Sequence, residues 1–177
     1  MAGMDRHELA TLGLQADTVG MLEGLTTTRA IRRYADEPVP DHVLRDIMFA
    51  ATRAPSGSNR QPFRFLVLTD GETAQQAKAL IARGARAVWG AKRGDDGYDE
   101  GTGTDLSSPK ARMAATMQQY VDNIERVPAR VLGCLVRYRA PNPNEGASVY
   151  PAVQNVLLAA RALGYGGVLT GFHAFVE

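Results

Sequence analysis

The chain has 177 residues, 45% of them apolar and 22% charged, with a net charge of +1. These values suit one globular domain and argue against a nucleic-acid partner. The single cysteine, Cys134, excludes an internal disulfide, and we find neither a secretory signal nor an apolar run of roughly 20 residues that could span a bilayer. We therefore expect a cytoplasmic protein with no membrane partner.

The first part of the chain predicts one weak helix and one strong one. Residues 1–24 are weakly helical, whereas residues 41–53 follow two prolines and carry Asp41 in the first turn, where the helix dipole favours a carboxylate. Apolar residues recur at helical spacing in this second segment at Val43, Leu44, Ile47, Met48 and Ala51.

The middle of the chain predicts a strand followed by two helices. Residues 63–69 (FRFLVLT) are typical of a buried strand, and residues 73–88 predict a helix rich in Ala and Leu. Residues 90–109 are rich in glycine and acidic residues, which predicts a loop. A further helix is predicted at residues 110–126, before Pro128.

The last part predicts a second strand at residues 131–138, a helix that Ser148 caps and Gly164 ends, and the start of a third strand at residues 166–170. Strands that alternate with long helices predict a layered α/β-type arrangement, in one domain spanning residues 1–177. Because the third strand has barely begun, either another subunit completes a small sheet or the chain lacks a C-terminal segment, and we expect the second.

An arginine cluster lies before the first strong helix, in the segment Arg29-Ala30-Ile31-Arg32-Arg33. Guanidinium groups donate paired hydrogen bonds to phosphate, and a fixed positive charge can stabilise negative charge on a redox ring. The alternative is an exposed basic turn that pairs with Asp36 and Glu37.

The segment Ala54–Arg64 (APSGSNRQPFR) joins the first strong helix directly to a strand. Gly57 permits close approach of a ligand, and the flanking prolines stiffen the loop. Asn59 and Gln61 each offer a donor and an acceptor, which suits the edge of a heterocycle. The alternative is a well-capped helix end.

The pair Gly166-Gly167 follows a helix, where backbone N–H groups could face a ligand, although such a pair is usually only a turn. The three histidines are scattered without metal-ligand spacing, so we predict no metal site.

Together these segments resemble the nitroreductase family of FMN-dependent oxidoreductases. The resemblance is carried by TTRAIRRYADEPV, AATRAPSGSNRQPFRFLVL and YPAVQNVLLAARALGYGG, in that order. It implies an α+β fold, a nitroreductase-like α/β sandwich with a central sheet flanked by helices, built as an intertwined homodimer with FMN at the interface.

The resemblance also implies residue roles. Arg29 would meet the FMN phosphate, with Thr28 and Ala30 beside it, and Arg32 would lie near the N1/C2 carbonyl edge. The loop of the partner subunit would pack against the flavin, and the glycine pair would present backbone toward N5. The loop residues concerned are Pro55, Ser56, Gly57, Asn59 and Gln61, and the glycines are Gly166 and Gly167.

The chain departs from the family pattern at three places. Thr28-Arg29-Ala30 stands where the family often has Arg-Arg-Ser, Phe63 replaces a common tryptophan, and family members continue for several tens of residues beyond the glycine pair.

Residues 86–110 lie where relatives place elements that cover the flavin. Trp89 and Tyr98 could stack on a substrate ring if this segment closes as a lid, the alternative being a disordered surface loop. The resemblance implies hydride transfer from NADPH or NADH, through flavin N5, to a small oxidised acceptor such as a nitroaromatic or quinone. A protein that binds or sequesters FMN without turnover is the alternative function.

Overall fold

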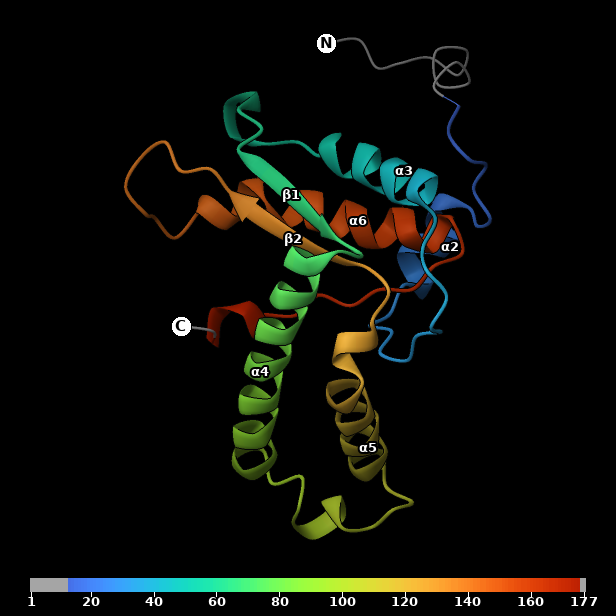
Figure 1. Cartoon of the computed structure of the whole chain (residues 1–177), viewed down its shortest axis with the longest axis vertical. Coiled ribbons are helices and arrows are strands. Elements are labelled where there is room, and N and C mark those ends of the chain that lie inside the picture. The colour runs from blue at the N-terminus through green and yellow to red at the C-terminus, as the bar shows by residue number, and fades with distance from the viewer. Residues whose placement is uncertain (1–12, 176–177) are drawn as a thin grey trace. The chain divides into compact units, whose positions relative to one another are not determined.

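The structure is a computed structural model and describes residues 13–175 (Figure 1). Its longer elements are α2 (Met21–Thr27), α3 (Asp41–Thr52), β1 (Phe63–Leu68), α4 (Glu72–Asp95), α5 (Pro109–Asp122), β2 (Arg130–Leu135) and α6 (Tyr150–Ala162). Short 3-10 helices are η1 (Gly57–Asn59), η2 (Gly101–Gly103), η3 (Ile124–Arg126), η4 (Glu145–Ser148) and η5 (Phe172–Phe175). Over the described range, each helix is too short or too polar to cross a membrane.

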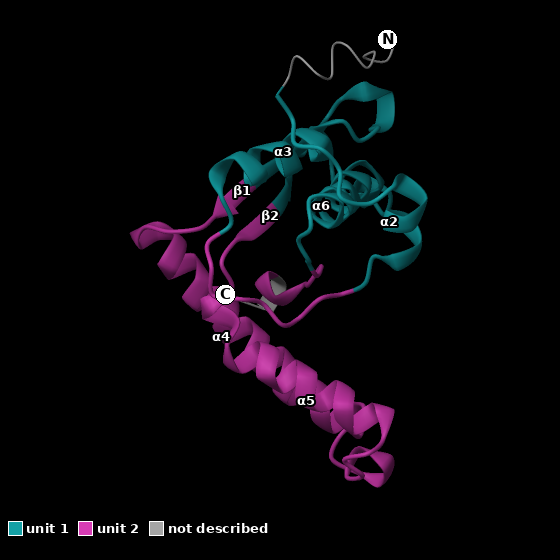
Figure 2. Cartoon of the chain, turned by 90° about the vertical axis from the view of Figure 1, so that its right-hand side faces the viewer, with its two compact units in different colours: residues 1–29, 39–65, 133–167 teal, residues 30–38, 66–132, 168–177 magenta. Residues whose placement is uncertain are grey.

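The chain divides into two compact units, which Figure 2 colours separately. Unit 1 comprises the residues up to Arg29 together with Val39–Phe65 and Gly133–Gly167. Unit 2 comprises Ala30–Pro38, Leu66–Leu132 and the residues from Val168 onward. Each unit is therefore assembled from three segments that are distant in sequence. A single domain over residues 1–177 stays a prediction.

The two strands pair directly and run antiparallel (Figure 1). The backbone N–H of Val136 donates to the carbonyl oxygen of Pro62 at 2.7 Å, at the end where β1 begins. In β1, Phe63 is buried, Phe65 is half-buried and Arg64 between them is exposed, which is the alternation expected of a strand. Both predicted strands are present, but β2 ends at Leu135 rather than at residue 138, and β1 is not the buried strand that was predicted, because Leu66 and Val67 are 55% and 37% exposed.

The predicted third strand at residues 166–170 is wrong, because these residues have no strand pairing in the structure. Leu169 in this segment is 58% exposed. A short apolar run predicts a strand only where a neighbouring strand can satisfy its backbone groups. Within residues 13–175, β1 and β2 pair only with each other.

In unit 1, α3 packs along α6 through the apolar faces that the sequence predicted. Val43, Ile47 and Ala160 are buried in this contact, with Val156 and Leu163 packed against them. The side-chain amide of Asn155 also donates to the carbonyl oxygen of Ala50 at 3.2 Å. The end of α6 is confirmed at Gly164, whose φ of +84° lies in the left-handed region that glycine tolerates.

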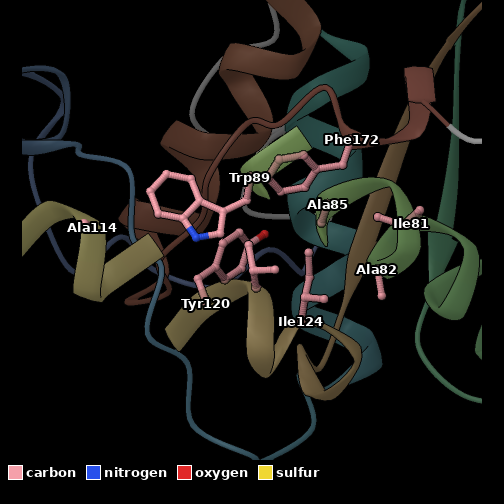
Figure 3. Packing of buried hydrophobic residues seen from close by; sticks show 9 residues of the cluster. Ile81, Ala82, Ala85, Trp89, Ala114, Tyr120, Ile124 and Phe172 are labelled. Carbon is pink, nitrogen blue, oxygen red and sulfur yellow. The ribbon is translucent and has the colours of Figure 1, made fainter. Parts of the chain in front are cut away.

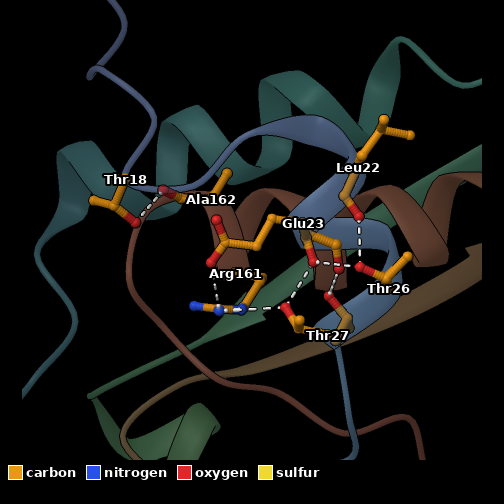
Figure 4. A network of polar contacts seen from close by, with 9 residues as sticks. Thr18, Leu22, Glu23, Thr26, Thr27, Arg161 and Ala162 are labelled. Carbon is orange, nitrogen blue, oxygen red and sulfur yellow. Dashed lines mark hydrogen bonds and ion pairs between the residues drawn. The ribbon is translucent and has the colours of Figure 1, made fainter.

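The short helix α2 is attached to the end of α6 (Figure 4). The N–H and hydroxyl groups of Thr18 both donate to the carbonyl oxygen of Ala162 at 2.7 Å. Arg161 donates to the hydroxyl of Thr27 at 3.3 Å and forms an ion pair with Glu23 at 3.7 Å. A seven-residue helix is too short to be stable alone, so these contacts hold it in place. Of the weak helix predicted over residues 1–24, residues 1–12 lie outside the described residues, and the prediction is wrong for residues 13–20, because α2 begins only at Met21.

In unit 2, α4 and α5 enclose an aromatic and aliphatic core (Figure 3). Tyr120, Ile124 and Phe172 are all buried in it, and Trp89 is 3% exposed. The predicted end of α4 near residue 88 is wrong, since the helix continues to Asp95. The extended part of α4 contains Gly90 and Gly94, and a glycine inside a helix costs roughly 1 kcal/mol. Burial of the Trp89 side chain, worth about 1.5–3 kcal/mol, helps to offset this cost.

The helix predicted at residues 110–126 is confirmed as α5 followed by η3. The hydroxyl of Ser108 accepts a hydrogen bond from the N–H of Ala111 at 3.0 Å, and Pro109 occupies the first helical position. This is the preferred chemistry of a helix start.

Candidate functional site

The loop between α3 and β1, which we call the amide loop (residues 55–61), has an unusual backbone. Ser58, Asn59 and Gln61 have φ values of 53°, 50° and 49°. Residues other than glycine rarely adopt this left-handed backbone conformation, which costs roughly 1–2 kcal/mol per residue. Asparagine tolerates this region better than most residues, so the strain falls mainly on Ser58 and Gln61. Such strained residues persist only where the surroundings enforce them, and they are concentrated at ligand-binding sites.

Hydrogen bonds within unit 1 enforce this conformation. The N–H of Gly57 donates to the hydroxyl of Ser148 at 3.2 Å. The N–H of Gln61 donates to the hydroxyl of Ser56 at 2.8 Å, and that of Asn59 donates to the Ser56 carbonyl at 2.9 Å. The sequence prediction that Ser148 caps α6 is wrong, because the helix is preceded by Val149 and no side chain caps it. Ser148 instead fastens the amide loop.

The amide loop presents a donor and an acceptor side by side. Asn59 and Gln61 are exposed, and the side-chain N–H of Gln61 donates to Oδ1 of Asn59 at 3.4 Å. This contact leaves Nδ2 of Asn59 and Oε1 of Gln61 available to a ligand. Such a pair matches a heterocycle edge that alternates N–H and C=O groups, as the isoalloxazine ring of FMN does.

The environment of Gly57 also fits a flat ligand. A Cβ atom built there would meet only the Ser148 hydroxyl, at 3.5 Å, which is an ordinary contact. Its φ is not in the left-handed region, so nothing within the described part of unit 1 demands glycine. Close approach of a ligand remains a reason for it. Pro55 is exposed and Ser56 half-buried at the start of the same loop.

The glycine pair Gly166-Gly167 is explained in part by packing within the chain rather than by contact with a ligand. A Cβ atom at Gly167 would lie 2.9 Å from Cδ2 of Leu157, so a larger residue here would require the Leu157 side chain of α6 to shift. Gly166 is exposed. No hydrogen bond between this pair and the amide loop occurs among the residues that the structure describes.

Thr28 and Arg29 lie where α2 ends. The hydroxyl of Thr28 donates to the carbonyl oxygen of Gly24 at 2.5 Å, so it can only accept a hydrogen bond from a ligand while this contact is kept. Arg29 is exposed, which leaves its guanidinium available to an anion.

Ala30 and Arg32 belong to unit 2, where Ala30 is exposed and Arg32 is half-buried. Asp36 pairs with Arg126, so this carboxylate does not neutralise the arginine cluster as the alternative interpretation supposed.

The half-buried Tyr34 and the buried Tyr120 lie near Arg32, and sequence reasoning missed both. Burial raises the pKa of Tyr34, and it also raises that of Tyr120. The charge of Arg32 acts in the opposite direction on both pKa values but is the smaller effect. The rings of Tyr34 and Tyr120 lie 6.1 Å apart, and the hydroxyl of Tyr34 donates to the carbonyl oxygen of Ile31 at 2.5 Å. The packed tyrosines hold the backbone beside Arg32. Tyr34 directly follows the arginine cluster, which is the one signal the sequence offered.

The predicted lid residues are engaged with one another. Trp89 is buried, its indole N–H donates to Oε1 of Gln118 at 2.9 Å, and its ring lies 5.3 Å from that of Tyr98. Arg93 is held by Asp99 and by Gln118. Trp89 is therefore a core residue here rather than a ring offered to a substrate, while substrate stacking on the half-buried Tyr98 stays a prediction.

A hollow of about 470 Å³ lies elsewhere in unit 1, lined in part by Gln15, His42 and Tyr165. None of the predicted site residues lines it.

A sequence profile described as the Nitroreductase family matches residues 25–177. The chain belongs to the nitroreductase family. The matched range contains every predicted site residue, and the fold is the α+β fold of this family.

Relatives and solved structures agree with the family assignment. A Methanothermobacter thermautotrophicus protein, provisionally named NADH dehydrogenase/NAD(P)H nitroreductase, is 26% identical over 86% of this chain and 61% of its own. A Desulfovibrio desulfuricans protein crystallised in complex with FMN is 28% identical, with a TM-score of 0.60 over 86% of this chain and 69% of its own. A variant of NfnB, an FMN- and NADPH-dependent nitroreductase from Sphigopyxis sp. strain HMH, is 27% identical, with a TM-score of 0.55 over 82% of this chain and 71% of its own.

This chain covers less than two thirds of the length of each of the first three curated relatives: 22%, 61% and 17%.

Proposed function

We propose that this nitroreductase-family protein is an FMN-dependent oxidoreductase that passes reducing equivalents from NADPH or NADH to a small oxidised acceptor, such as a nitroaromatic or a quinone. The observation that carries the proposal is the strained amide loop with its exposed donor–acceptor pair, Asn59 and Gln61. The FMN in the solved relative from Desulfovibrio desulfuricans and the family match over residues 25–177 support the choice of cofactor.

FMN, when bound, would supply the redox chemistry, by accepting hydride from the nicotinamide and delivering it to the acceptor. The chain's own groups would bind and orient the cofactor. Asn59 and Gln61 would hydrogen-bond the edge of the ring, Pro55, Ser56 and Gly57 would pack against it, and Arg29 would bind the phosphate. Gly166 and Gly167 would lie along its N5 side.

Arg32 is the group we assign to flavin electrostatics. A guanidinium stays charged at any physiological pH, so it can stabilise negative charge at the carbonyl edge of the ring without a proton transfer. Tyr34 and Tyr120 would keep their protons beside it, because burial raises both pKa values. We therefore propose no side-chain general acid or base.

We also propose that the amide loop of one subunit serves the flavin of its partner in a cytoplasmic homodimer. Exposed apolar residues in unit 1 support an association between copies, since a patch of this kind favours an interface. Met21, Leu22 and Leu25 on α2 are 82%, 77% and 53% exposed.

Visible absorbance of the purified full chain tests the proposal. We expect a yellow protein whose colour bleaches with NADPH or NADH and returns with a nitroaromatic or quinone acceptor. Colour that persists with both nucleotides would favour the alternative of a flavin-sequestering protein. A folded chain that takes up no FMN at saturation would contradict both functions.

Arg32→Ala tests the electrostatic assignment. We expect weaker FMN binding or slower turnover by about 2–4 kcal/mol, as for loss of an oxyanion donor. Arg83→Ala is a matched control, because Arg83 is an exposed residue of α4. Wild-type flavin content and turnover in Arg32→Ala would remove Arg32 from the site.

A further inference from the structure

Two arginines in unit 1 flank one exposed aromatic ring. The guanidinium carbon of Arg60 lies 4.4 Å from the ring centroid of Tyr138, and that of Arg139 lies 5.4 Å from the same centroid. Tyr138 is 54% exposed, and both arginines are exposed. Antiparallel pairing explains the arrangement, since Arg60 precedes β1 and Tyr138 follows β2 at the same end of the strand pair.

These guanidinium groups are not neutralised by a close carboxylate. Neither Arg60 nor Arg139 forms an ion pair or a side-chain hydrogen bond within residues 13–175. The neighbouring Arg137 is committed, since it donates to both carboxylate oxygens of Glu145, at 3.0 and 2.7 Å. Arg137 lowers the pKa of Glu145, with a smaller contribution from Arg139. Arg60, Tyr138 and Arg139 therefore form an exposed patch. Because Glu145 is already bonded to Arg137, the two guanidinium groups of this patch have no carboxylate partner in the part of the chain that the structure describes.

The patch adjoins the amide loop. Arg60 lies between Asn59 and Gln61, the two residues that we propose bind the flavin edge. A dinucleotide that places its nicotinamide on the flavin must leave its adenosine end outside the flavin pocket. Because Arg60 is itself a residue of the amide loop, the Arg60–Tyr138–Arg139 patch is contiguous with the residues that we propose hold the flavin edge.

We propose that this patch recognises the adenosine 2′-phosphate of NADPH and makes the protein selective for NADPH over NADH. The inference rests on the proposed function and deepens it. Guanidinium forks bind a phosphomonoester through paired, charge-assisted hydrogen bonds. Arginine planes and aromatic rings also stack on nucleobases. NADH has the same adenine but lacks this phosphate, so the charges distinguish the two nucleotides.

The test measures binding and turnover on the full chain reconstituted with FMN. Calorimetry compares 2′,5′-ADP with 5′-AMP, which lacks the 2′-phosphate, and steady-state kinetics compares NADPH with NADH. Hydrogen bonds to a charged group support about tenfold tighter binding of 2′,5′-ADP. We expect Arg139→Gln to remove this preference and to lower kcat/KM for NADPH by about tenfold. Flavin content and melting temperature should not change, and kcat/KM for NADH, which lacks the 2′-phosphate, should fall by much less than kcat/KM for NADPH.

Arg83→Gln is the charge-matched control and should keep the preference. Equal binding of 2′,5′-ADP and 5′-AMP by the wild type would overturn the inference, as would an equal fall for both nucleotides in Arg139→Gln. Inorganic phosphate that competes as well as 2′,5′-ADP would also overturn it, because the patch would then be a general anion site. Equal turnover with NADH and NADPH would overturn the selectivity and leave the proposed function standing. Absence of flavin reduction by either nucleotide would contradict the proposed function, and the binding comparison would still decide the inference.

Discussion

Replacing Ser148 by alanine removes the acceptor that holds the N–H of Gly57 at 3.2 Å. In the amide loop, Ser58 and Gln61 adopt the left-handed conformation at a cost of roughly 1–2 kcal/mol each, so a loop freed from this contact has reason to relax. Gly57 is exposed, and water can therefore replace the lost acceptor. The net worth of such a hydrogen bond is about 0.5–1.5 kcal/mol.

If the strained loop is the conformation that binds FMN, this free energy appears as lost affinity. We expect the dissociation constant of FMN to rise about two- to tenfold in Ser148→Ala. Titration of the FMN-free protein with FMN, followed by quenching of flavin fluorescence, measures the change. The melting temperature should fall only slightly, because the contact lies on an exposed loop.

Two controls separate this effect from a general loss of stability. Ser148→Thr keeps a hydroxyl and should retain FMN affinity. Ser107→Ala removes an exposed hydroxyl that donates to Asp105 at 2.8 Å in unit 2, and it should also leave affinity unchanged. Unchanged FMN affinity in Ser148→Ala would refute the link between loop conformation and cofactor binding.

Two further predictions concern the core of unit 2. Ile124 is fully buried, so Ile124→Ala should lower the free energy of unfolding by about 2–5 kcal/mol in urea, whereas Leu106→Ala, at a side chain that is 88% exposed, should change it by less than about 0.5 kcal/mol. A larger effect at Leu106 than at Ile124 would contradict the packing described. Burial raises the pKa of Tyr34 and Tyr120 in the folded state, so the stability that they contribute is complete below their ordinary pKa near 10.0 and is lost as the pH rises above it. The double variant Tyr34→Phe and Tyr120→Phe should unfold at a higher pH than the wild type, as followed by circular dichroism, and an unchanged midpoint would count against the burial of the two hydroxyls.

Local chemistry explains why several elements could be predicted from the sequence. Helix α3 shows an apolar stripe with helical spacing and a carboxylate in its first turn, at Asp41. In β1, strand alternation and a buried Phe63 follow from residue types that favour strands. The amide loop was recognisable because prolines, glycine and amides concentrate where a plain connector would need only a turn residue.

Other features depend on contacts between segments that are distant in sequence. Helix α4 continues through Gly90 and Gly94 because Trp89 is buried in the core of unit 2, and local propensity gives no sign of that partner. The hydroxyl of Ser148 is a plausible helix cap by its position, yet it accepts from Gly57, which lies 91 positions away.

The amino-acid sequence by itself determined the helical stripes, the two strands and the chemistry of the amide loop, since these arise from residue type and short-range spacing. Only the tertiary structure decided the left-handed backbone at Ser58, Asn59 and Gln61, the burial of Trp89 and the meeting of Arg60 and Arg139 at Tyr138. The physical reason is that strain, burial and clustered charge are each held by groups brought from elsewhere in the chain, which a local pattern cannot specify.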